Sequence, residues 1–176
     1  MPNSSTFEIK PIGELINRVL TEHPGTWADP FVRDSRFKHR MAFTNDLNTD
    51  FDATSHTDAR EFLQSLPTDS LDGVLFDPPY SPRQITECYQ GVGLQVSITD
   101  TQSAFYTTLK QEISRVVRNG GMVVSCSWNS GGIGKTLGFE LVELLLVPHG
   151  SWHNDTIVTV ERSNCPATLF DASRQP

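Results

Sequence analysis

The sequence has little cysteine, no long apolar run and no excess of positive charge. Its three cysteines are odd in number and widely spaced, without any C-x-x-C pair, which argues against a disulfide framework and a zinc knuckle. No basic region leads into an apolar stretch at the N-terminus, and no segment approaches the length of a membrane span. We therefore expect a cytoplasmic protein that does not enter a membrane.

The formal net charge of -7 argues against a large nucleic-acid footprint, because Lys and Arg make most phosphate contacts. The charge is unevenly distributed, however. Four fixed positive charges fall within eight residues, on Arg33, Arg36, Lys38 and Arg40. Such a run is either a solvated surface loop or a contact for a phosphate or cofactor, and the sequence leaves both interpretations open.

The chain of 176 residues is long enough for one domain with a full core and too short for two ordinary ones. Apolar periodicity predicts helices over residues 7–20, 59–66 and 104–117. Apolar runs bounded by turn residues predict strands over residues 26–31, 41–44, 71–76 and 122–128. We assign residues 1–162 to the domain and residues 163–176, which show no periodicity, to a flexible tail.

The last two apolar runs, residues 139–147 and 155–161, are joined by a short connection and predict an antiparallel hairpin. Strands that alternate with helices predict a mainly parallel sheet with helices on both faces and one reversed strand at an edge. Residues 81–101 are too irregular to assign, and part of this stretch fits either a helix or a lid.

The tetrapeptide Asp77-Pro78-Pro79-Tyr80 directly follows the apolar run of residues 71–76. Open α/β sheets bind ligands outside the carboxyl ends of their strands, so the tetrapeptide lies where such a fold places its chemistry. A purely structural alternative is a tight strand exit, in which Asp77 caps a turn and Tyr80 packs over the sheet edge.

In this strand context the tetrapeptide resembles the motif of S-adenosylmethionine-dependent amino-methyltransferases that act on nucleic acids, especially the adenine-N6 branch. Lys10-Pro11 in a predicted helix, Asp29-Pro30-Phe31 after the first strand and the terminal hairpin add to a likeness that covers residues 7–162. The resemblance implies a single-domain Rossmann-like methyltransferase fold, with a mainly parallel seven-stranded sheet and a C-terminal antiparallel hairpin. It also implies methylation of adenine N6 in DNA, ahead of adenine in RNA or cytosine N4 in DNA.

The chemistry of that family accounts for the residue types in the motif. An exocyclic amine on a nucleobase is a poor nucleophile because its lone pair is delocalised into the ring. The resemblance implies that the Asp77 carboxylate and the Pro78 carbonyl accept its N–H groups and aim its lone pair at the methyl sulfonium. Pro79 presets the direction of that carbonyl, and Tyr80 stacks on the base once it has left its helix. The reactive methyl group belongs to the cofactor, so no metal is needed.

The resemblance also implies a site for the cofactor, S-adenosylmethionine. Its candidate residues are Lys10, Pro11 and Ile12 near the methionine portion, Asp29, Pro30 and Phe31 in the same pocket, Asp46 at the ribose, and Asp58 and Ala59 at the adenine ring. Asp58 is equally suited to cap a helix N-terminus. Candidate substrate contacts are Tyr80, Arg83 and Gln84, with His149, Trp152 and His153 near the hairpin turn as further possibilities.

Two departures from the family pattern bear on activity. A glycine-rich turn normally follows Asp-Pro-Phe, whereas this chain continues with Val32-Arg33-Asp34-Ser35-Arg36, which places side chains where close approach normally demands none. Either Arg33 or Arg36 reaches the carboxylate of the cofactor, or cofactor binding is impaired. No separate target-recognition domain is visible. Either a second copy of the chain or a protein partner therefore supplies sequence recognition, or specificity is low. The resemblance implies DNA, ahead of RNA, as the nucleic-acid partner.

Two other functions stay open. Residues 129–136 nearly match a phosphate-binding P-loop after a strand, although Asn129 replaces the first glycine. That match would indicate nucleotide hydrolysis. A non-catalytic methyltransferase-like subunit also fits the altered turn, the small size and the acidic balance, and a measurement of cofactor affinity would distinguish it from an enzyme.

Overall fold

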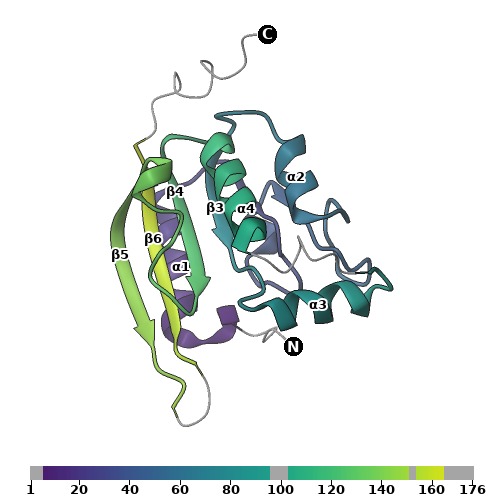
Figure 1. Ribbon diagram of the computed structural model, residues 1–176. Coiled ribbons are helices and arrows are strands. Elements are labelled where there is room, and N and C mark those ends of the chain that lie inside the picture. The colour runs from purple at the N-terminus through teal and green to yellow at the C-terminus, as the bar shows by residue number, and fades with distance from the viewer. Residues whose placement is uncertain (1–5, 96–102, 151–153, 165–176) are drawn as a thin grey trace.

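The fold is taken from a computed structural model, which describes residues 6–95, 103–150 and 154–164 (Figure 1). One sheet of six strands has the order β2-β1-β3-β4-β6-β5. Its strands are β1 (Trp27–Asp29), β2 (Phe43–Thr44), β3 (Leu71–Phe76), β4 (Val117–Ser127), β5 (Phe139–Val147) and β6 (Thr156–Ser163). Neighbouring strands from β2 to β4 pair in parallel, and β6 is antiparallel to both β4 and β5.

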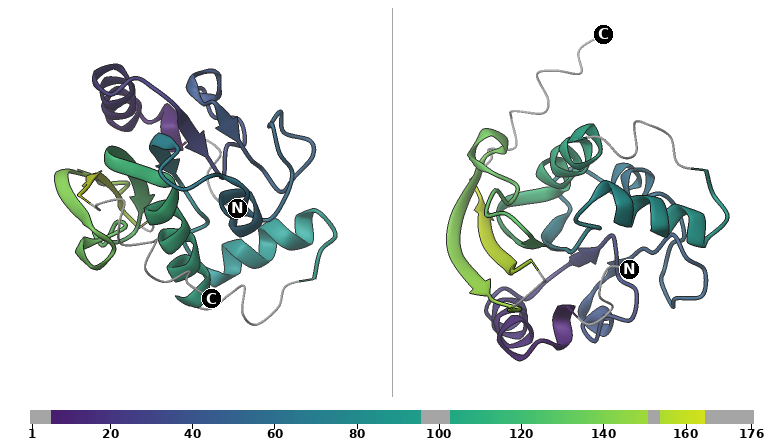
Figure 2. Two further views of the ribbon diagram at one scale, coloured as in Figure 1. Left: turned by 90° about the horizontal axis from the view of Figure 1, so that it is seen from above. Right: turned by 60° about the horizontal axis from the view of Figure 1, so that its bottom comes forward.

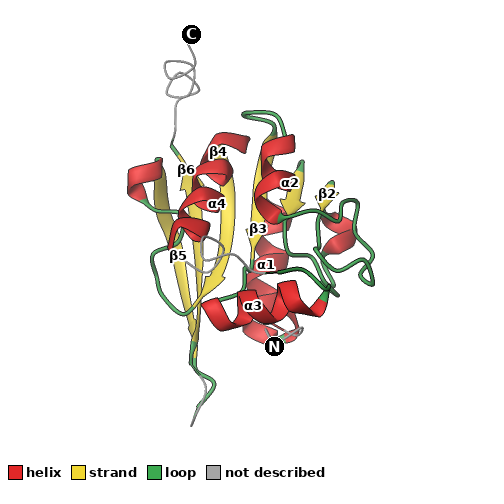
Figure 3. Ribbon diagram, turned by 45° about the vertical axis from the view of Figure 1, so that its right-hand side comes forward, coloured by secondary structure: helices red, strands yellow, loops and turns green. Residues whose placement is uncertain are grey.

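Helices cover both faces of the sheet, as the sequence predicts. They are α1 (Lys10–Glu22), α2 (Ala59–Ser65), α3 (Pro82–Gly91) and α4 (Ser103–Val116). Figures 2 and 3 show α1 on one side of the sheet and α2 and α4 on the other. In the part of the chain that the structure describes, no helix is both long enough and apolar enough to cross a membrane.

Two details of the predicted sheet are wrong. The described residues contain six strands instead of seven, because residues 66–70, the whole connection between α2 and β3, are too few to add a strand and a crossover. The reversed strand is also not at the edge. β6 lies between β4 and β5, because its Val158 and Val160 pack into the core beneath α1, and β5 forms the edge instead.

The strand β3 is buried on both faces and ends at the rim of the sheet. Val74 and Phe76 pack with α2 and α4, whereas Leu75 packs with α1 on the opposite face. A strand that contributes to two cores has to be apolar almost throughout, which explains why residues 71–76 are detectable in the sequence. The first polar side chain after this run, Asp77, is thereby positioned at the carboxyl end of the sheet.

The glycine-rich loop of residues 129–134 is not built as a P-loop. It leads into a single 3-10 turn, η4 (Lys135–Leu137), and not into an α-helix. The Ile133 and Gly134 N–H groups donate to the Glu161 carboxylate at 2.6 and 2.9 Å. Gly132 has a φ of 48°, and a Cβ there would clash with the same carboxylate. An internal carboxylate occupies the amides that a P-loop would offer to phosphate, which argues against nucleotide hydrolysis.

Two stretches that the sequence left uncertain are partly described. Residues 81–101 contain α3, which Ser81 caps through a hydrogen bond from the Gln84 N–H, and residues 96–101 lie outside the described residues. The strand β6 continues to Ser163, one residue past the expected end of the domain. The predicted tail from residue 165 onward lies outside the described residues.

Candidate active site

A cavity of about 600 Å³ lies along the carboxyl ends of the parallel strands. Its layout follows the sheet order. The β1–β2 half is lined by Pro30, Phe31, Arg33, Asn45, Asp46, Phe51, Asp58 and Ala59. The β4–β6 half is lined by Trp128, His149, Asn154 and Thr156. The tetrapeptide Asp77-Pro78-Pro79-Tyr80, which follows β3, lies between the two halves because β3 lies between β1 and β4.

Asp77 is a partly buried carboxylate at the centre of the cavity wall. Burial raises its pKa to about 6, although hydrogen bonds from Tyr80 and Thr6 and the positive charge of Arg33 oppose the shift. The Tyr80 hydroxyl donates to Asp77 Oδ1. Asp77 is therefore a carboxylate at neutral pH that can take up a proton with little cost, as a proton acceptor requires.

The two prolines are fixed by their neighbours. The Tyr106 hydroxyl, from α4, donates to the Pro79 carbonyl. The Gln84 side chain accepts a hydrogen bond from the Tyr80 N–H at 2.6 Å. Among the described residues, no hydrogen bond uses the Pro78 carbonyl. The tetrapeptide is thus held on both sides, and it keeps one backbone acceptor beside Asp77 available.

Asp29, the last residue of β1, is fully buried and only half satisfied. Its Oδ1 accepts a hydrogen bond from the Phe31 N–H at 2.9 Å, whereas no described group bonds to its Oδ2. Burial raises the pKa of Asp29 to about 8, and the nearby charge of Asp77 adds to the shift. A buried acceptor without a partner is costly, so the Asp29 carboxyl is suited to a cationic group that binds next to Pro30 and Phe31.

The turn after β1 keeps a glycine-like conformation without glycine. Arg33 has a φ of 43°, in the left-handed region, and its N–H donates to Asp46 Oδ2 at 3.0 Å. The Val32 N–H donates to the Asn45 carbonyl at 3.0 Å, which ties the turn to the end of β2. The Arg33 guanidinium lies 5.5 Å from the centre of the Phe51 ring, inside the β1–β2 half. The turn therefore adopts the left-handed conformation without a glycine, because the Asn45 carbonyl and the Asp46 carboxylate hold its N–H groups.

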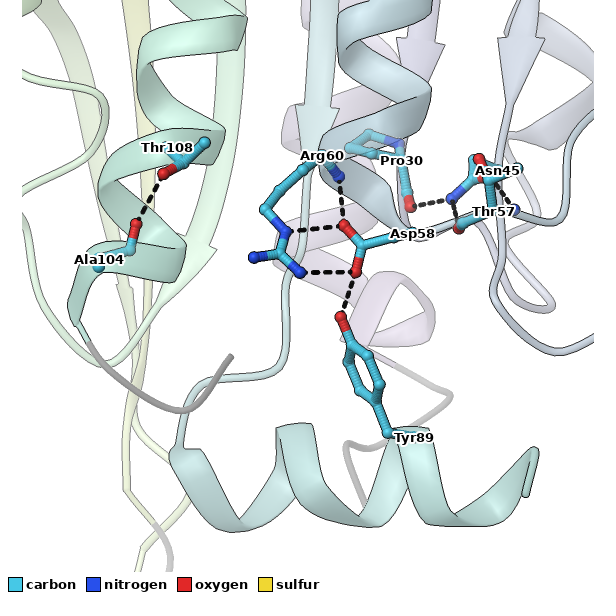
Figure 4. Close-up of polar contacts among 8 residues, drawn as sticks. All are labelled: Pro30, Asn45, Thr57, Asp58, Arg60, Tyr89, Ala104 and Thr108. Atoms are coloured by element: carbon cyan, nitrogen blue, oxygen red, sulfur yellow. Dashed lines mark hydrogen bonds and ion pairs between the residues drawn. The ribbon is translucent and has the colours of Figure 1, made fainter. Parts of the chain in front are cut away.

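Polar contacts connect the β1–β2 half to α2 and α3 (Figure 4). The Asn45 side chain donates to the Pro30 and Thr57 carbonyls at 3.2 and 3.0 Å. Asp58 caps α2, because its Oδ1 accepts the Arg60 N–H at 2.8 Å. It also accepts the Arg60 guanidinium and the Tyr89 hydroxyl of α3.

The electrostatics of Asp58 and Asp46 differ. Burial acts to raise the pKa of Asp58, but the bonds from Arg60 and Tyr89 outweigh it and hold the pKa below its usual value. The pKa of Asp46 is raised by burial, despite hydrogen bonds from the N–H groups of Asn48 and Arg33. Asp58 is therefore a firmly ionised carboxylate with its partners already in place, whereas Asp46 gains from an added hydrogen-bond donor.

The structure brings most of the predicted site residues together. Pro30, Phe31, Asp46, Asp58, Ala59, Gln84 and the whole tetrapeptide line the cavity, and Asp29 lies buried directly before Pro30. The others do not line it: Lys10 and Pro11 are exposed, Ile12 is in the core, and Arg83 pairs with Glu87 on the surface. Arg36 points elsewhere too, toward Glu8 and the Phe37 ring.

Several cavity residues are missing from the sequence prediction. Thr6 and Ile9 line the cavity in place of Lys10 to Ile12. Three more lining residues are Asn45, directly after β2, Tyr89 of α3, and Trp128, directly after β4. Asn45 and Trp128 carry a signal that could have found them, because Asn45 directly follows one predicted strand and Trp128 is the last residue of another, at the same edge as Asp77. Trp152 and His153 lie outside the described residues. Among the described residues, no group of three His, Cys, Asp or Glu side chains could hold a metal ion.

The sequence matches no protein-family model, and it matches no curated protein sequence. The structure, in contrast, is similar to solved methyltransferases. A SAM-dependent methyltransferase from Archaeoglobus fulgidus has a TM-score of 0.59 and 12% identity, over 88% of this chain and 94% of that one. TrmN from Thermus thermophilus has a TM-score of 0.58 and 17% identity, over 86% of this chain but only 48% of its own.

A third similar structure is 1,6-didemethyltoxoflavin-N1-methyltransferase from Burkholderia thailandensis, solved with bound 1,6-didemethyltoxoflavin and S-adenosylhomocysteine. It has a TM-score of 0.58 and 12% identity, over 93% of this chain and 80% of that one. This chain thus spans about half the length of TrmN and most of the other two proteins. It has the Rossmann-like fold of S-adenosylmethionine-dependent methyltransferases.

Proposed function

We propose that the protein transfers a methyl group from S-adenosylmethionine to the N6 amino group of adenine in DNA. The observation that carries this proposal is the position of Asp77-Pro78-Pro79-Tyr80, at the end of β3 between the two halves of the cavity. A carboxylate and a backbone carbonyl there provide the two neighbouring acceptors that an exocyclic amine requires.

The choice of S-adenosylmethionine as cofactor rests on the fold and on two buried carboxyl groups, Asp29 and Asp46. The similar structures include methyltransferases described as SAM-dependent or solved with S-adenosylhomocysteine. In this chain, the buried Oδ2 of Asp29 suits the ammonium group of the methionine portion. Asp46, whose pKa is raised by burial, is suited to accept hydrogen bonds from the ribose hydroxyls. The residues of the β1–β2 half thus fit the polar groups of this cofactor.

In the proposed reaction, the C–S bond of the cofactor breaks and an N–C bond to the amine forms. S-adenosylmethionine supplies the activated methyl group on its sulfonium centre. Asp77 and the Pro78 carbonyl accept the two N–H groups of the amine, which frees its lone pair from the ring and aims it across the cavity. The amine proton passes to the Asp77 carboxylate, whose pKa of about 6 lets it return the proton to water at neutral pH.

The acceptor class is supported by two kinds of observation. Two of the similar structures are N-methyltransferases by name, NodS from Bradyrhizobium japonicum and the toxoflavin enzyme. The choice of adenine in DNA rests on Asp at position 77, by resemblance to the adenine-N6 branch. The net charge of -7 indicates a small footprint on DNA, so we propose that a second copy or a protein partner supplies sequence recognition.

The test is transfer of labelled methyl from S-adenosylmethionine to DNA and RNA by the wild type, by Asp77→Ala and by Asp34→Ala. Asp34 is an exposed carboxylate in the turn after β1 and serves as the matched control. We expect Asp77→Ala to lose about a hundredfold to a thousandfold in rate, the cost of removing a preorganised polar contact to the reacting group. Asp34→Ala should stay near the wild type. Equal labelling by all three proteins would refute the mechanism.

A non-catalytic methyltransferase-like subunit is the second candidate. The observation that favours it is Arg33, whose side chain lines the β1–β2 half in place of the glycine-rich turn that the family normally has there. Calorimetry with S-adenosylhomocysteine separates the two proposals. Micromolar affinity supports the enzyme, whereas no binding at millimolar concentration supports the inert subunit.

A further inference from the structure

The β4–β6 half of the cavity contains an aromatic side chain to which the proposed mechanism gives no role. Trp128 follows the last residue of β4, one strand beyond the tetrapeptide and on the side away from β1 and β2. It lines the cavity, and 39% of its surface is exposed. Large apolar side chains exposed inside a concave site are typical of ligand contacts.

The position of Trp128 is well defined by its surroundings. Its ring lies edge-on to the Tyr80 ring, with centroids 5.5 Å apart and an interplanar angle of 64°. The residues on either side of Trp128 are also hydrogen-bonded, because the Ser127 hydroxyl contacts both the N–H and the carbonyl of Asn129. The Asn129 side chain in turn accepts a hydrogen bond from the Gly131 N–H at 2.9 Å. The indole is thus fixed beside the tetrapeptide before any ligand arrives, which reduces the ordering cost of binding.

The layout of the cavity leaves the β4–β6 half for the acceptor molecule. Of the polar groups that suit the cofactor, Asp29 ends β1 and Asp46 lies two residues after β2. The amine acceptors follow β3, so the body of the acceptor molecule has to extend from Asp77 toward β4 and β6. Trp128 is the large aromatic surface that the described residues offer there.

We infer that Trp128 is a substrate-positioning residue, on which the acceptor ring stacks while its exocyclic amine reaches Asp77. The ligand class is a planar heteroaromatic ring with an exocyclic amine, presented from a single strand or flipped out of a duplex. This inference rests on the proposed function for the identity of the ring. The stacking itself is independent of sequence, because every base has a π-face.

The experiment compares Trp128→Ala and Trp128→Phe with Phe43→Ala, all in the full chain. Phe43, on β2, is 37% exposed and does not line the cavity, so it is a control of matched exposure. The measurements are KM and kcat for an adenine-containing single-stranded oligonucleotide, the Kd of the same labelled oligonucleotide by anisotropy, and the Kd of S-adenosylhomocysteine by calorimetry.

We expect Trp128→Ala to raise KM and the oligonucleotide Kd by about tenfold, the usual cost of losing one base-stacking side chain. Trp128→Phe should restore most of the loss, and the cofactor Kd should stay within about twofold. An oligonucleotide Kd unchanged from that of Phe43→Ala would overturn the inference. So would an equal loss of cofactor affinity, which would indicate a general role in shaping the cavity.

The outcomes separate this inference from the proposed function. If the wild type binds the oligonucleotide but transfers no methyl group, the proposed function fails, and the binding comparison still decides the role of Trp128. If methyl transfer proceeds and Trp128→Ala matches the wild type, the inference fails and the proposed function stands. If the wild type binds no oligonucleotide at all, both are overturned.

Discussion

The two halves of the cavity are built in different ways. In the β1–β2 half, Asp46 and Asp58 accept backbone N–H groups, and the Asn45 side chain bridges two carbonyls. In the β4–β6 half, the walls are the Trp128 ring and a His149 ring that is 2.7 Å from the Thr156 hydroxyl. The first half holds carboxylates fixed by backbone hydrogen bonds, and the second offers one large aromatic surface, Trp128, beside polar side chains. Preorganised polar groups suit a cofactor that never changes, whereas a stacking surface suits an acceptor presented in several contexts.

In the β1–β2 half, we expect the largest effect on cofactor binding from Asp29→Asn. The amide keeps an acceptor for the Phe31 N–H, but unlike the carboxyl group it cannot ionise to balance the charge of the cofactor ammonium. We expect the Kd of S-adenosylhomocysteine to rise about tenfold to a hundredfold, as for truncation of one partner of a buried charge pair. Calorimetry measures this effect, and an unchanged affinity would remove Asp29 from the site.

The same substitution should stabilise the unliganded protein. The pKa of Asp29 is about 8 in the folded chain and near 3.8 when exposed, so folding takes up a proton between these values. The free energy of unfolding of the wild type should therefore fall as pH rises from about 4 to about 8. Asp29→Asn removes this dependence. Thermal unfolding at both ends of the range should show an advantage of the variant that grows with pH.

The junction of the two halves is tested by Tyr80→Phe, which keeps the ring and removes the hydroxyl that donates to Asp77. That bond lowers the pKa of Asp77, so its loss should raise the pKa above its present value of about 6. The proposed mechanism needs the carboxylate, so activity should be lost as pH falls through this pKa. The acid limb of kcat/KM, measured from about pH 5 to about pH 8, should move to higher pH in the variant. An unmoved limb would show that another group controls it.

Sequence reasoning succeeded best where one physical signal was strong. The strand before Asp77 is apolar almost throughout because it serves two cores, so both the strand and the position of Asp77 at its end were detectable. The helix position of Lys10 to Ile12 was also predictable, but not that Thr6 and Ile9, just before it, would line the cavity. The conformation of the turn at Arg33 could not be predicted, because it is fixed by Asn45 and Asp46, thirteen residues away and without a local signature.

The smallest expected effects come from two matched hydroxyl deletions, Tyr89→Phe and Tyr106→Phe. The Tyr89 hydroxyl bonds Asp58 in the β1–β2 half, and the Tyr106 hydroxyl bonds the Pro79 carbonyl of the tetrapeptide. Each should lower the free energy of unfolding by about 1 kcal/mol, the usual net value of one hydrogen bond.

Their kinetic effects should differ in kind. Tyr89→Phe should raise the cofactor Kd by about threefold with kcat unchanged, whereas Tyr106→Phe should lower kcat by a similar factor with the cofactor Kd unchanged. Calorimetry and steady-state kinetics on the two variants distinguish these results. If both substitutions shift the same parameter, the cavity acts as one unit. In that case the two halves would not be specialised, one for the cofactor and the other for the acceptor, despite their different construction.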